Sequence, residues 1–348
     1  MRLFHNDYNE MCHPKILAKL NAAAVEPMTS YGVDCHCENA AEMIRKLCGR
    51  EDVMVHFLLG GTQTNLTVIA SALRPYQAVI APISAHINEH ETGAIEATGH
   101  KIVLLPEHAG KISAAQVSKF VEEHYGGNGC AAEHMAQPKL VYISQPTELG
   151  TLYTLSELET LAVVCKNYGL YLYVDGARLG YGLAADGNDV QISDLARLCD
   201  AFYIGGTKQG TMFGEAVVIT NPSIAEDFRY MIKQRGGMMA KGWLLGLQFE
   251  AMFEDGLYFQ SAKQANIFSD QIRRTLRDLG YPLVVESNTN QVFTIMSDSV
   301  LDELSKEFMF TEWSRVDENH RMIRFCTSWA TTQESTDLLC DKIVELSK

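Results

Sequence analysis

Lys208 stands in a run of small residues directly after a short apolar segment, Tyr203-Ile204-Gly205-Gly206-Thr207-Lys208. A lysine placed there can reach inward into a cleft, where desolvation or a nearby cation keeps its amine neutral enough to attack a carbonyl. The glycines let the backbone approach a bulky molecule, and Thr207 can hydrogen-bond a phosphate. An isolated lysine of this kind is more often a solvated turn residue, so its partners elsewhere in the chain decide the interpretation.

One such partner is Asp175, which follows the apolar run 170–174 and precedes Gly176-Ala177-Arg178. An aspartate at the carboxyl end of a parallel strand lies where open α/β sheets bind their ligands. A buried carboxylate needs a cationic partner. The pyridine nitrogen of pyridoxal phosphate (PLP) is such a partner, and an aspartate keeps it protonated so that the ring can accept electrons. The alternative is a structural pair of Asp175 with Arg178 that caps the strand.

A phosphate group needs hydrogen-bond donors, and Gly60-Gly61-Thr62 can supply them. This run follows a predicted strand and opens a predicted helix, so backbone N–H groups and the helix dipole face an anion placed there. Taken alone, it is equally well explained as a tight turn, and it matches neither the P-loop nor the dinucleotide fingerprint. His86 follows the next predicted strand, where an imidazole can stack on a flat ring and act as acid or base, or serve structure alone.

These residues lie at the ends of short apolar and amphipathic segments that alternate from about residue 50 to 220. The predicted strands are 53–58, 78–81, 102–105, 140–144, 170–175, 201–205 and 216–220, and the predicted helices are 64–73, 113–124, 155–168 and 223–234. The alternation predicts an α/β fold with a mostly parallel central sheet and helices on both faces. Only ten residues separate the last two strands, so this pair is predicted to be antiparallel, with Lys208 in the turn.

A chain of 348 residues is expected to form one large domain and a smaller one. After about residue 250 the pattern changes to long helices with a few strands, such as 291–295 and 322–326. We predict a large domain over 26–250 and a small α+β domain over 1–25 and 251–348. The run Gly126-Gly127-Asn128-Gly129 is predicted to end a helix and start a surface loop.

Composition narrows the choice of partners. The net charge of −14, from 43 acidic and 29 basic residues, argues against a nucleic-acid partner. No apolar run approaches the roughly 20 residues needed to cross a membrane, and the first residues lack a secretory signal pattern. The nine cysteines are scattered, and Cys35-His36-Cys37 lacks metal-site spacing. We therefore expect a cytoplasmic protein without a metal.

In this order, the segments resemble the threonine aldolase and β-eliminating lyase group of fold-type-I PLP enzymes. The similarity covers most of the chain. It includes Asn6-Asp7, Tyr31-Gly32-Val33-Asp34, Gly61-Thr62-Gln63-Thr64-Asn65, His86 with Glu91, Asp175-Gly176-Ala177-Arg178, Thr207-Lys208, Gly236-Gly237-Met238 and Arg324.

The resemblance implies a role for each matching position. Lys208 would hold PLP as a Schiff base, Asp175 would face its ring nitrogen, and His86 would stack on the ring. Gly61, Thr62 and Thr207 would bind the phosphate. Arg178 and Arg324, with Asn6, would hold the α-carboxylate of an amino acid substrate, because a planar guanidinium matches a carboxylate. In a homodimer or homotetramer with shared active sites, Tyr31 and residues 235–241 would reach a neighbouring subunit's cofactor.

The chain departs from the family pattern in two places. Aldolases of this group carry a second active-site histidine after the strand 140–144, whereas this chain reads Ser144-Gln145-Pro146-Thr147-Glu148-Leu149-Gly150. The family's Gly-Gly-Gly-Met-Arg element reads Gly236-Gly237-Met238-Met239 here, so Lys241 would replace the missing arginine near the phosphate.

The function that the resemblance implies is cleavage of a β-hydroxy-α-amino acid, such as threonine or allo-threonine, to glycine and an aldehyde. The proton of the β-hydroxyl would pass to His86, to Glu91 or to a water near Glu148. Alternatives with the same cofactor are β-elimination, racemisation and transamination of a related amino acid. A non-catalytic module that binds a nucleotide at Gly61 and Thr62 is an alternative from a different class.

Overall fold

Seven strands form the central sheet, in the order β2-β8-β7-β6-β5-β3-β4, in the computed structural model, which describes residues 1–126 and 132–347. The strands are β2 (Met54–Leu58), β3 (Gln77–Pro82), β4 (Lys101–Leu105), β5 (Gln137–Ser144), β6 (Tyr171–Asp175), β7 (Ala201–Gly205) and β8 (Glu215–Ile219). Strand β8 runs antiparallel to both of its neighbours, and the other pairs are parallel. The mostly parallel sheet and the predicted antiparallel pair around Lys208 are therefore confirmed.

Helices cover both faces of this sheet because its central strands alternate apolar side chains to either side. The first face packs on α1 (Pro14–Ala22), α2 (Cys35–Cys48), α6 (Ala114–Tyr125), α7 (Leu155–Tyr168), α9 (Ile192–Leu198) and α12 (Trp243–Phe253). The second packs on α3 (Gly61–Ala72), α5 (Ala94–Ala97), α10 (Pro222–Ala225) and α11 (Phe228–Gln234). Two further short helices, α4 (His86–Glu89) and α8 (Leu179–Leu183), follow strands β3 and β6.

The helix predicted over 223–234 is wrong as one continuous element. It divides into α10 and α11 because Asp227 between them adopts a left-handed backbone conformation with φ of 58°, which interrupts helical hydrogen bonding. The predicted helix 113–124 corresponds to α6, and Gly126 is its C-cap. The rest of the predicted loop after Gly126, residues 127–129, lies outside the described residues.

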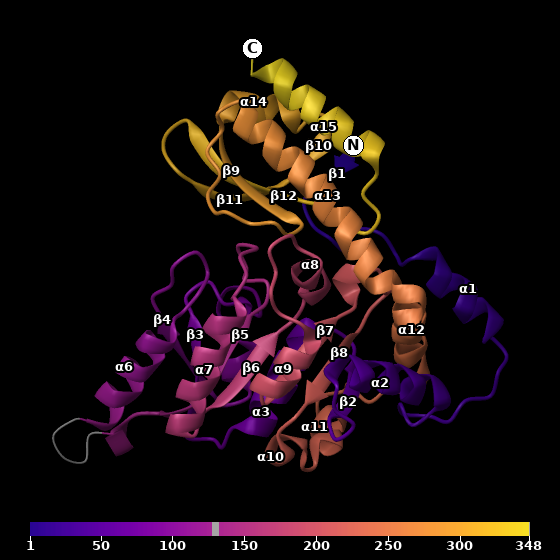
Figure 1. The fold of residues 1–348 in the computed structure, drawn as a ribbon, viewed down its shortest axis with the longest axis vertical. Coiled ribbons are helices and arrows are strands. Elements are labelled where there is room, and N and C mark those ends of the chain that lie inside the picture. Colours follow the sequence, from indigo (N-terminus) through magenta and orange to yellow (C-terminus); the bar gives the residue numbers. More distant parts are fainter. Residues whose placement is uncertain (127–131, 348) are drawn as a thin grey trace.

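The smaller part of the molecule is built on a three-stranded antiparallel sheet of β11 (Thr311–Arg315), β12 (His320–Cys326) and β9 (Gln291–Ser297). A two-stranded parallel pair joins β1 (Arg2–Leu3) to β10 (Phe308–Met309). Helices α13 (Leu257–Asp278), α14 (Asp298–Leu304) and α15 (Gln333–Leu346) enclose its own apolar core. Figure 1 shows α13 running from the large sheet domain into this part, where both marked chain ends lie. The division at residue 250 stays a prediction, since α12 spans that point.

Candidate active site

Asp175, the last residue of β6, is 3% exposed, and its carboxylate accepts four hydrogen bonds. The donors are Tyr203 Oη at 2.5 Å, Tyr142 Oη at 2.6 Å, Asn65 Nδ2 at 3.0 Å and the backbone N–H of Ala177 at 3.0 Å. Burial acts to raise the pKa of Asp175, but the charge of His86 and the two tyrosine hydrogen bonds lower it below its ordinary value. The site therefore holds a negative charge with no cation hydrogen-bonded to it among the described residues.

His86 begins α4 and is linked to Asp175 through a buried chain of polar groups. Its Nδ1 lies 2.9 Å from Glu91 Oε1, and the same oxygen accepts a hydrogen bond from Asn65 Nδ2 at 2.8 Å. Burial acts to lower the pKa of His86, but the hydrogen bond to Glu91 and the charges of Glu148 and Asp175 raise it overall. Glu91 consequently orients His86 and favours its protonated form.

Lys208 lies in a single turn of 3₁₀ helix, Thr207–Gln209, between β7 and β8. Its backbone carbonyl accepts a hydrogen bond from Tyr181 Oη at 2.6 Å, which fixes the turn. The preceding Gly206 leaves no room for a side chain, because a Cβ there would lie 2.6 Å from the carbonyl oxygen of Gly214. Burial, with the charge of Arg178, lowers the pKa of Lys208. Its amine is thereby favoured in the neutral form that attacks a carbonyl.

Glu215, the first residue of β8, is a buried carboxylate that the sequence did not single out. It accepts hydrogen bonds from the N–H of Gly206 and from Thr207 Oγ1, both at 2.8 Å, so it holds the turn that carries Lys208. Burial raises its pKa to about 7. The predicted strand 216–220 begins one residue after the observed start of β8 at Glu215. An acidic residue directly before an apolar strand is the signal in the sequence that could have indicated a functional carboxylate here.

Helix α3 starts at Gly61, directly after β2. Its N-cap residue Gly60 has no side chain to cap the helix, so the first backbone N–H groups are open to an anion. Close packing sets the position of this turn, because a Cβ on Gly61 would lie 3.3 Å from Tyr203 Oη. The glycine thus brings the start of the helix next to a tyrosine that is bonded to Asp175.

One cavity of about 320 Å³ unites these groups. It is lined by Tyr8, Leu59, Gly60, Gly61, Thr62, His86, Glu148, Asp175, Ala177, Tyr203, Thr207, Lys208, Phe213 and Glu215. The predicted residues Lys208, Asp175, His86, Gly61, Thr62 and Thr207 are all brought together here. PLP requires three groups from a protein: an amine that reacts with its aldehyde, a carboxylate that faces its ring nitrogen, and backbone N–H groups that bind its phosphate. The cavity offers all three in Lys208, Asp175 and the start of α3.

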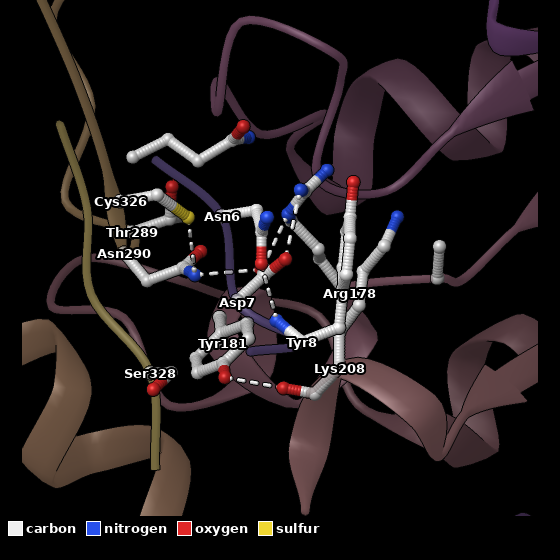
Figure 2. A network of polar contacts seen from close by, with 12 residues as sticks. Asn6, Asp7, Tyr8, Arg178, Tyr181, Lys208, Thr289, Asn290, Cys326 and Ser328 are labelled. Carbon is white, nitrogen blue, oxygen red and sulfur yellow. Dashed lines mark hydrogen bonds and ion pairs between the residues drawn. The ribbon is translucent and has the colours of Figure 1, made fainter. Parts of the chain in front are cut away.

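Arg178 faces the N-terminal segment and not Asp175. Its Nε and Nη2 donate to Asp7 Oδ2 and Oδ1 at 2.7 and 3.0 Å, and both side chains are buried. Asn290 Nδ2 donates to the same Asp7 carboxylate at 2.9 Å (Figure 2). The alternative pair of Arg178 with Asp175 is wrong. Nη1 of Arg178 makes no hydrogen bond within the described residues.

Arg324 on β12 is 9% exposed and only partly satisfied. Its Nη1 donates to Gln291 Oε1 and its Nη2 to the carbonyl oxygen of His5, each at 3.0 Å, while its buried Nε has no partner among the described residues. Asn6, next in the chain to His5, accepts a hydrogen bond from the N–H of Tyr8 at 3.0 Å and lies beside Asp7 in Figure 2. Arg324, Asn6 and Arg178 are not among the cavity-lining residues, so their carboxylate-binding role stays a prediction.

Tyr31 and Lys241 lie away from this cavity. The N–H of Tyr31 donates to the carbonyl oxygen of Ala240 at 3.2 Å, and its ring lies 5.1 Å from Lys233 Nζ. Lys241 is exposed. The structure of one chain does not bring them to the cofactor cavity, and their contribution to a neighbouring subunit stays a prediction.

Several functional positions were missed, namely Asn65, Tyr142 and Tyr203 together with Glu215. Both tyrosines sit two residues before the last residue of a buried strand, so strand alternation places them on one face. That signal was available, because a polar hydroxyl in a buried strand needs a partner. Asn65 lies within the motif that begins at Gly61, but the motif alone does not predict its hydrogen bonds to Glu91 and Asp175.

The mostly parallel central sheet, with Lys208 and Asp175 lining one cavity, defines the class of this protein, which is a fold-type-I PLP-dependent enzyme. An aspartate aminotransferase from Thermus thermophilus shares this fold, with a TM-score of 0.71 at 15% identity over 99% of this chain and 91% of that one. The model of the beta-eliminating lyase family matches residues 12–299. The chain belongs to the beta-eliminating lyase family, and it is a lyase.

Two relatives are closer than the aminotransferase. A low specificity L-threonine aldolase from a Pseudomonas species is 31% identical over 303 residues, which are 86% of this chain and 85% of that protein. The solved structure of a threonine aldolase from Leishmania major is 43% identical, with a TM-score of 0.97 over 100% of both chains. The family resemblance predicted from the sequence motifs is confirmed.

Proposed function

We propose that the protein is a PLP-dependent aldolase that cleaves a β-hydroxy-α-amino acid, of the threonine or allo-threonine type, to glycine and an aldehyde. The observation that carries the proposal is the meeting of Lys208, Asp175 and the start of α3 at one cavity. The likeness to two threonine aldolases supports the choice of substrate and of the bond that is broken.

The residues of the cavity suit each part of the cofactor. Lys208 would hold PLP as a Schiff base, and Asp175 would face its ring nitrogen. Gly61, Thr62 and Thr207 would bind the phosphate, with Lys241 reaching that of a neighbouring subunit. When bound, PLP supplies a protonated ring that accepts the electron pair released at Cα of the substrate. His86, oriented by Glu91, would lie on the face of that ring.

Arg178 and Arg324 would hold the α-carboxylate of the substrate, with Asn6 beside them. Each arginine retains N–H groups without a protein partner, Nη1 in Arg178 and Nε in Arg324, among the described residues. Asp7 fixes the orientation of Arg178 by binding two of its nitrogens. Fixing the carboxylate orients the Cα–Cβ bond for cleavage, and positioning of this kind lowers a barrier by up to roughly 7–11 kcal/mol.

Product analysis tests the proposal. Incubation of the purified PLP-loaded protein with threonine is expected to give glycine and acetaldehyde in equal amounts. Pyruvate and ammonia would instead indicate β-elimination, the opposite enantiomer racemisation, and amino transfer to a keto acid transamination. Lys208→Ala is expected to lose the visible absorption of bound PLP and the aldehyde product. If the wild-type protein binds no PLP, the aldolase proposal is wrong, and the alternative of a nucleotide-binding module would be tested next.

We also propose a cytoplasmic setting and a homodimer or homotetramer with shared active sites. The eight cysteines in the described part of the chain are free thiols, seven of them buried, which suits a reducing compartment. Apolar side chains gather in the exposed N-terminal segment, with Val25, Tyr31 and Val33 being 93%, 44% and 59% exposed. Within residues 1–126 and 132–347, no helix combines the length and apolar character needed to cross a bilayer. Light scattering of the purified protein measures the subunit number.

A further inference from the structure

Three carboxylates line the cavity, and they differ in how many of their oxygens are already in use. Both oxygens of Asp175 and both oxygens of Glu215 accept hydrogen bonds. Glu148 accepts a single hydrogen bond, from Ser144 Oγ to Oε1 at 2.9 Å. Its Oε2 has no hydrogen-bond partner among residues 1–126 and 132–347, and the side chain is only half-buried. Glu148 is therefore the carboxylate with an oxygen available to a molecule in the cavity.

The other acid–base candidates are less suited to accept a proton. Glu91 is 4% exposed and does not line the cavity, because it lies behind His86 with one oxygen bonded to both His86 and Asn65. His86 itself has its Nδ1 committed to Glu91, and its pKa is raised, despite burial, by that bond and by nearby carboxylates. A raised pKa favours the protonated ring, which donates a proton and does not accept one.

We propose that Glu148 is the base that takes the proton of the substrate's β-hydroxyl group, an assignment that rests on the proposed aldolase function. The O–H bond breaks and its proton passes to Glu148 Oε2, while the O–H electron pair forms the carbonyl of the aldehyde. The Cα–Cβ bond breaks at the same time and leaves its electron pair at Cα. Cα then takes a proton from water to give glycine, and Glu148 returns its proton to the hydroxide that remains.

The backbone holds Glu148 in a fixed place at the carboxyl end of the sheet. Ser144, which binds its side chain, pairs in register with Asp175 on the neighbouring strand. The turn after β5 is closed by the N–H of Thr147, which donates to the carbonyl oxygen of Thr151 at 2.9 Å, and Thr151 Oγ1 donates to the carbonyl oxygen of Ala109 at 2.6 Å. A base must be held in a fixed position near the group that it deprotonates, and these hydrogen bonds fix the turn that carries Glu148.

The opposite side of the same turn is bound to the segment that precedes β9. The carbonyl oxygen of Gly150 accepts hydrogen bonds from Ser287 Oγ at 2.7 Å and from Thr289 Oγ1 at 3.0 Å. Gly150 has φ of +82°, and a Cβ there would lie 2.8 Å from Thr289 Oγ1, so glycine is required. The turn that carries Glu148 is thus held both by the central sheet and by the segment before β9.

The test compares Glu148→Gln with Glu96→Gln, a matched change at an exposed glutamate on α5. Glutamine keeps the oxygen that accepts from Ser144 and removes only the basic oxygen. Four quantities are measured: kcat for threonine cleavage, PLP affinity of the cofactor-free protein by absorption titration, the spectral change on adding glycine, and exchange of the glycine Cα hydrogen with deuterated water by NMR. Glycine has no β-hydroxyl, so the last three do not need the proposed base.

For Glu148→Gln we expect kcat for threonine to fall by roughly 100- to 10,000-fold, with PLP affinity, the glycine spectrum and Cα exchange each within about threefold of wild type. Glu96→Gln should leave all four unchanged. Threonine cleavage that persists within about tenfold in Glu148→Gln overturns the assignment, as does an equal loss of glycine exchange or PLP binding, which would indicate a structural role. A wild-type protein that makes no glycine and acetaldehyde instead sinks the aldolase proposal itself.

Discussion

Arg178 and Asp7 form a buried, bidentate ion pair, in which Nε donates to Oδ2 at 2.7 Å and Nη2 donates to Oδ1 at 3.0 Å. The two residues are 171 positions apart in the chain, so the pair fastens the N-terminal segment to the loop that follows Asp175. It also orients the arginine that we expect to bind substrate. Its contribution can be measured separately from catalysis.

Asp7→Asn is expected to lower the free energy of unfolding at pH 7 by about 3–5 kcal/mol, because it leaves Arg178 buried without a counter-charge. Burial acts to raise the pKa of Asp7, but Arg178 and Lys208 lower it from 3.8 to about 2. A carboxylate whose pKa is lower in the folded protein than in the unfolded chain stabilises the fold at pH values above its unfolded-state pKa. This contribution to the free energy of unfolding is lost as the pH falls through the folded-state pKa. Between about pH 4 and 2, the free energy of unfolding of the wild type should therefore fall by about 2 kcal/mol, and that of Asp7→Asn should not show this fall.

Urea unfolding at several pH values measures this difference. Asp52→Asn, which breaks the exposed pair with Arg50, is the control and should leave the midpoint nearly unchanged. Equal stability of Asp7→Asn and wild type across this pH range would contradict a stabilising pair.

Glu215 is expected to make the free energy of unfolding depend on pH in the opposite sense to Asp7, and Glu215→Gln should remove this dependence. Burial raises the pKa of Glu215 from 4.5 to about 7, so the folded protein binds a proton that the unfolded chain releases. Wild-type stability should therefore fall by about 3 kcal/mol relative to the variant as the pH rises from about 4.5 to 7. Chemical unfolding of the cofactor-free protein gives the measurement, with Glu96→Gln as control. A constant wild-type-to-variant difference over this range would show that Glu215 is not proton-linked to folding.

Gly176→Ala is expected to destabilise the fold by at least about 3 kcal/mol, because a Cβ at this position would lie 1.8 Å from the carbonyl oxygen of Tyr203. The close approach lets the N–H of Gly205 donate to the carbonyl oxygen of Gly176 at 2.9 Å, which fixes Asp175 relative to the Lys208 turn. Gly60→Ala, where a Cβ meets nothing within 4 Å, is the comparison. Thermal unfolding that ranks the two variants equally would refute the steric argument.

Arg324→Lys is expected to raise the KM for threonine by roughly tenfold or more with a smaller change in kcat, because a lysine cannot reproduce the planar fork of a guanidinium. Arg321→Lys is the matched control on the same strand. Its guanidinium pairs with Asp298, Asp302 and Glu312 on the opposite side of β12. Steady-state kinetics that show the same KM for both variants would exclude Arg324 from substrate binding.

The sequence predicted the site best where chemistry and local pattern coincide. The short connection between β7 and β8 forced an antiparallel pair, so Lys208 was placed in the correct turn. Asp175 could be placed because a buried strand ran straight into it. The Asp7–Arg178 pair could not be predicted, since no local pattern links residues so far apart. The break at Asp227 was also hidden, because a left-handed residue other than glycine leaves no mark in hydrophobic periodicity.

The pairing of β1 with β10 sets an order on biosynthesis. Residues 2 and 3 are synthesised long before their strand partners, residues 308 and 309. At synthesis rates of about 5–20 residues per second, that wait lasts roughly 15–60 s. All seven strands of the central sheet, the last of which ends at Ile219, are made during this time, and so is Asn290, which binds Asp7. Strand β1 is therefore expected to pair with β10 only after the strands of the central sheet have been made.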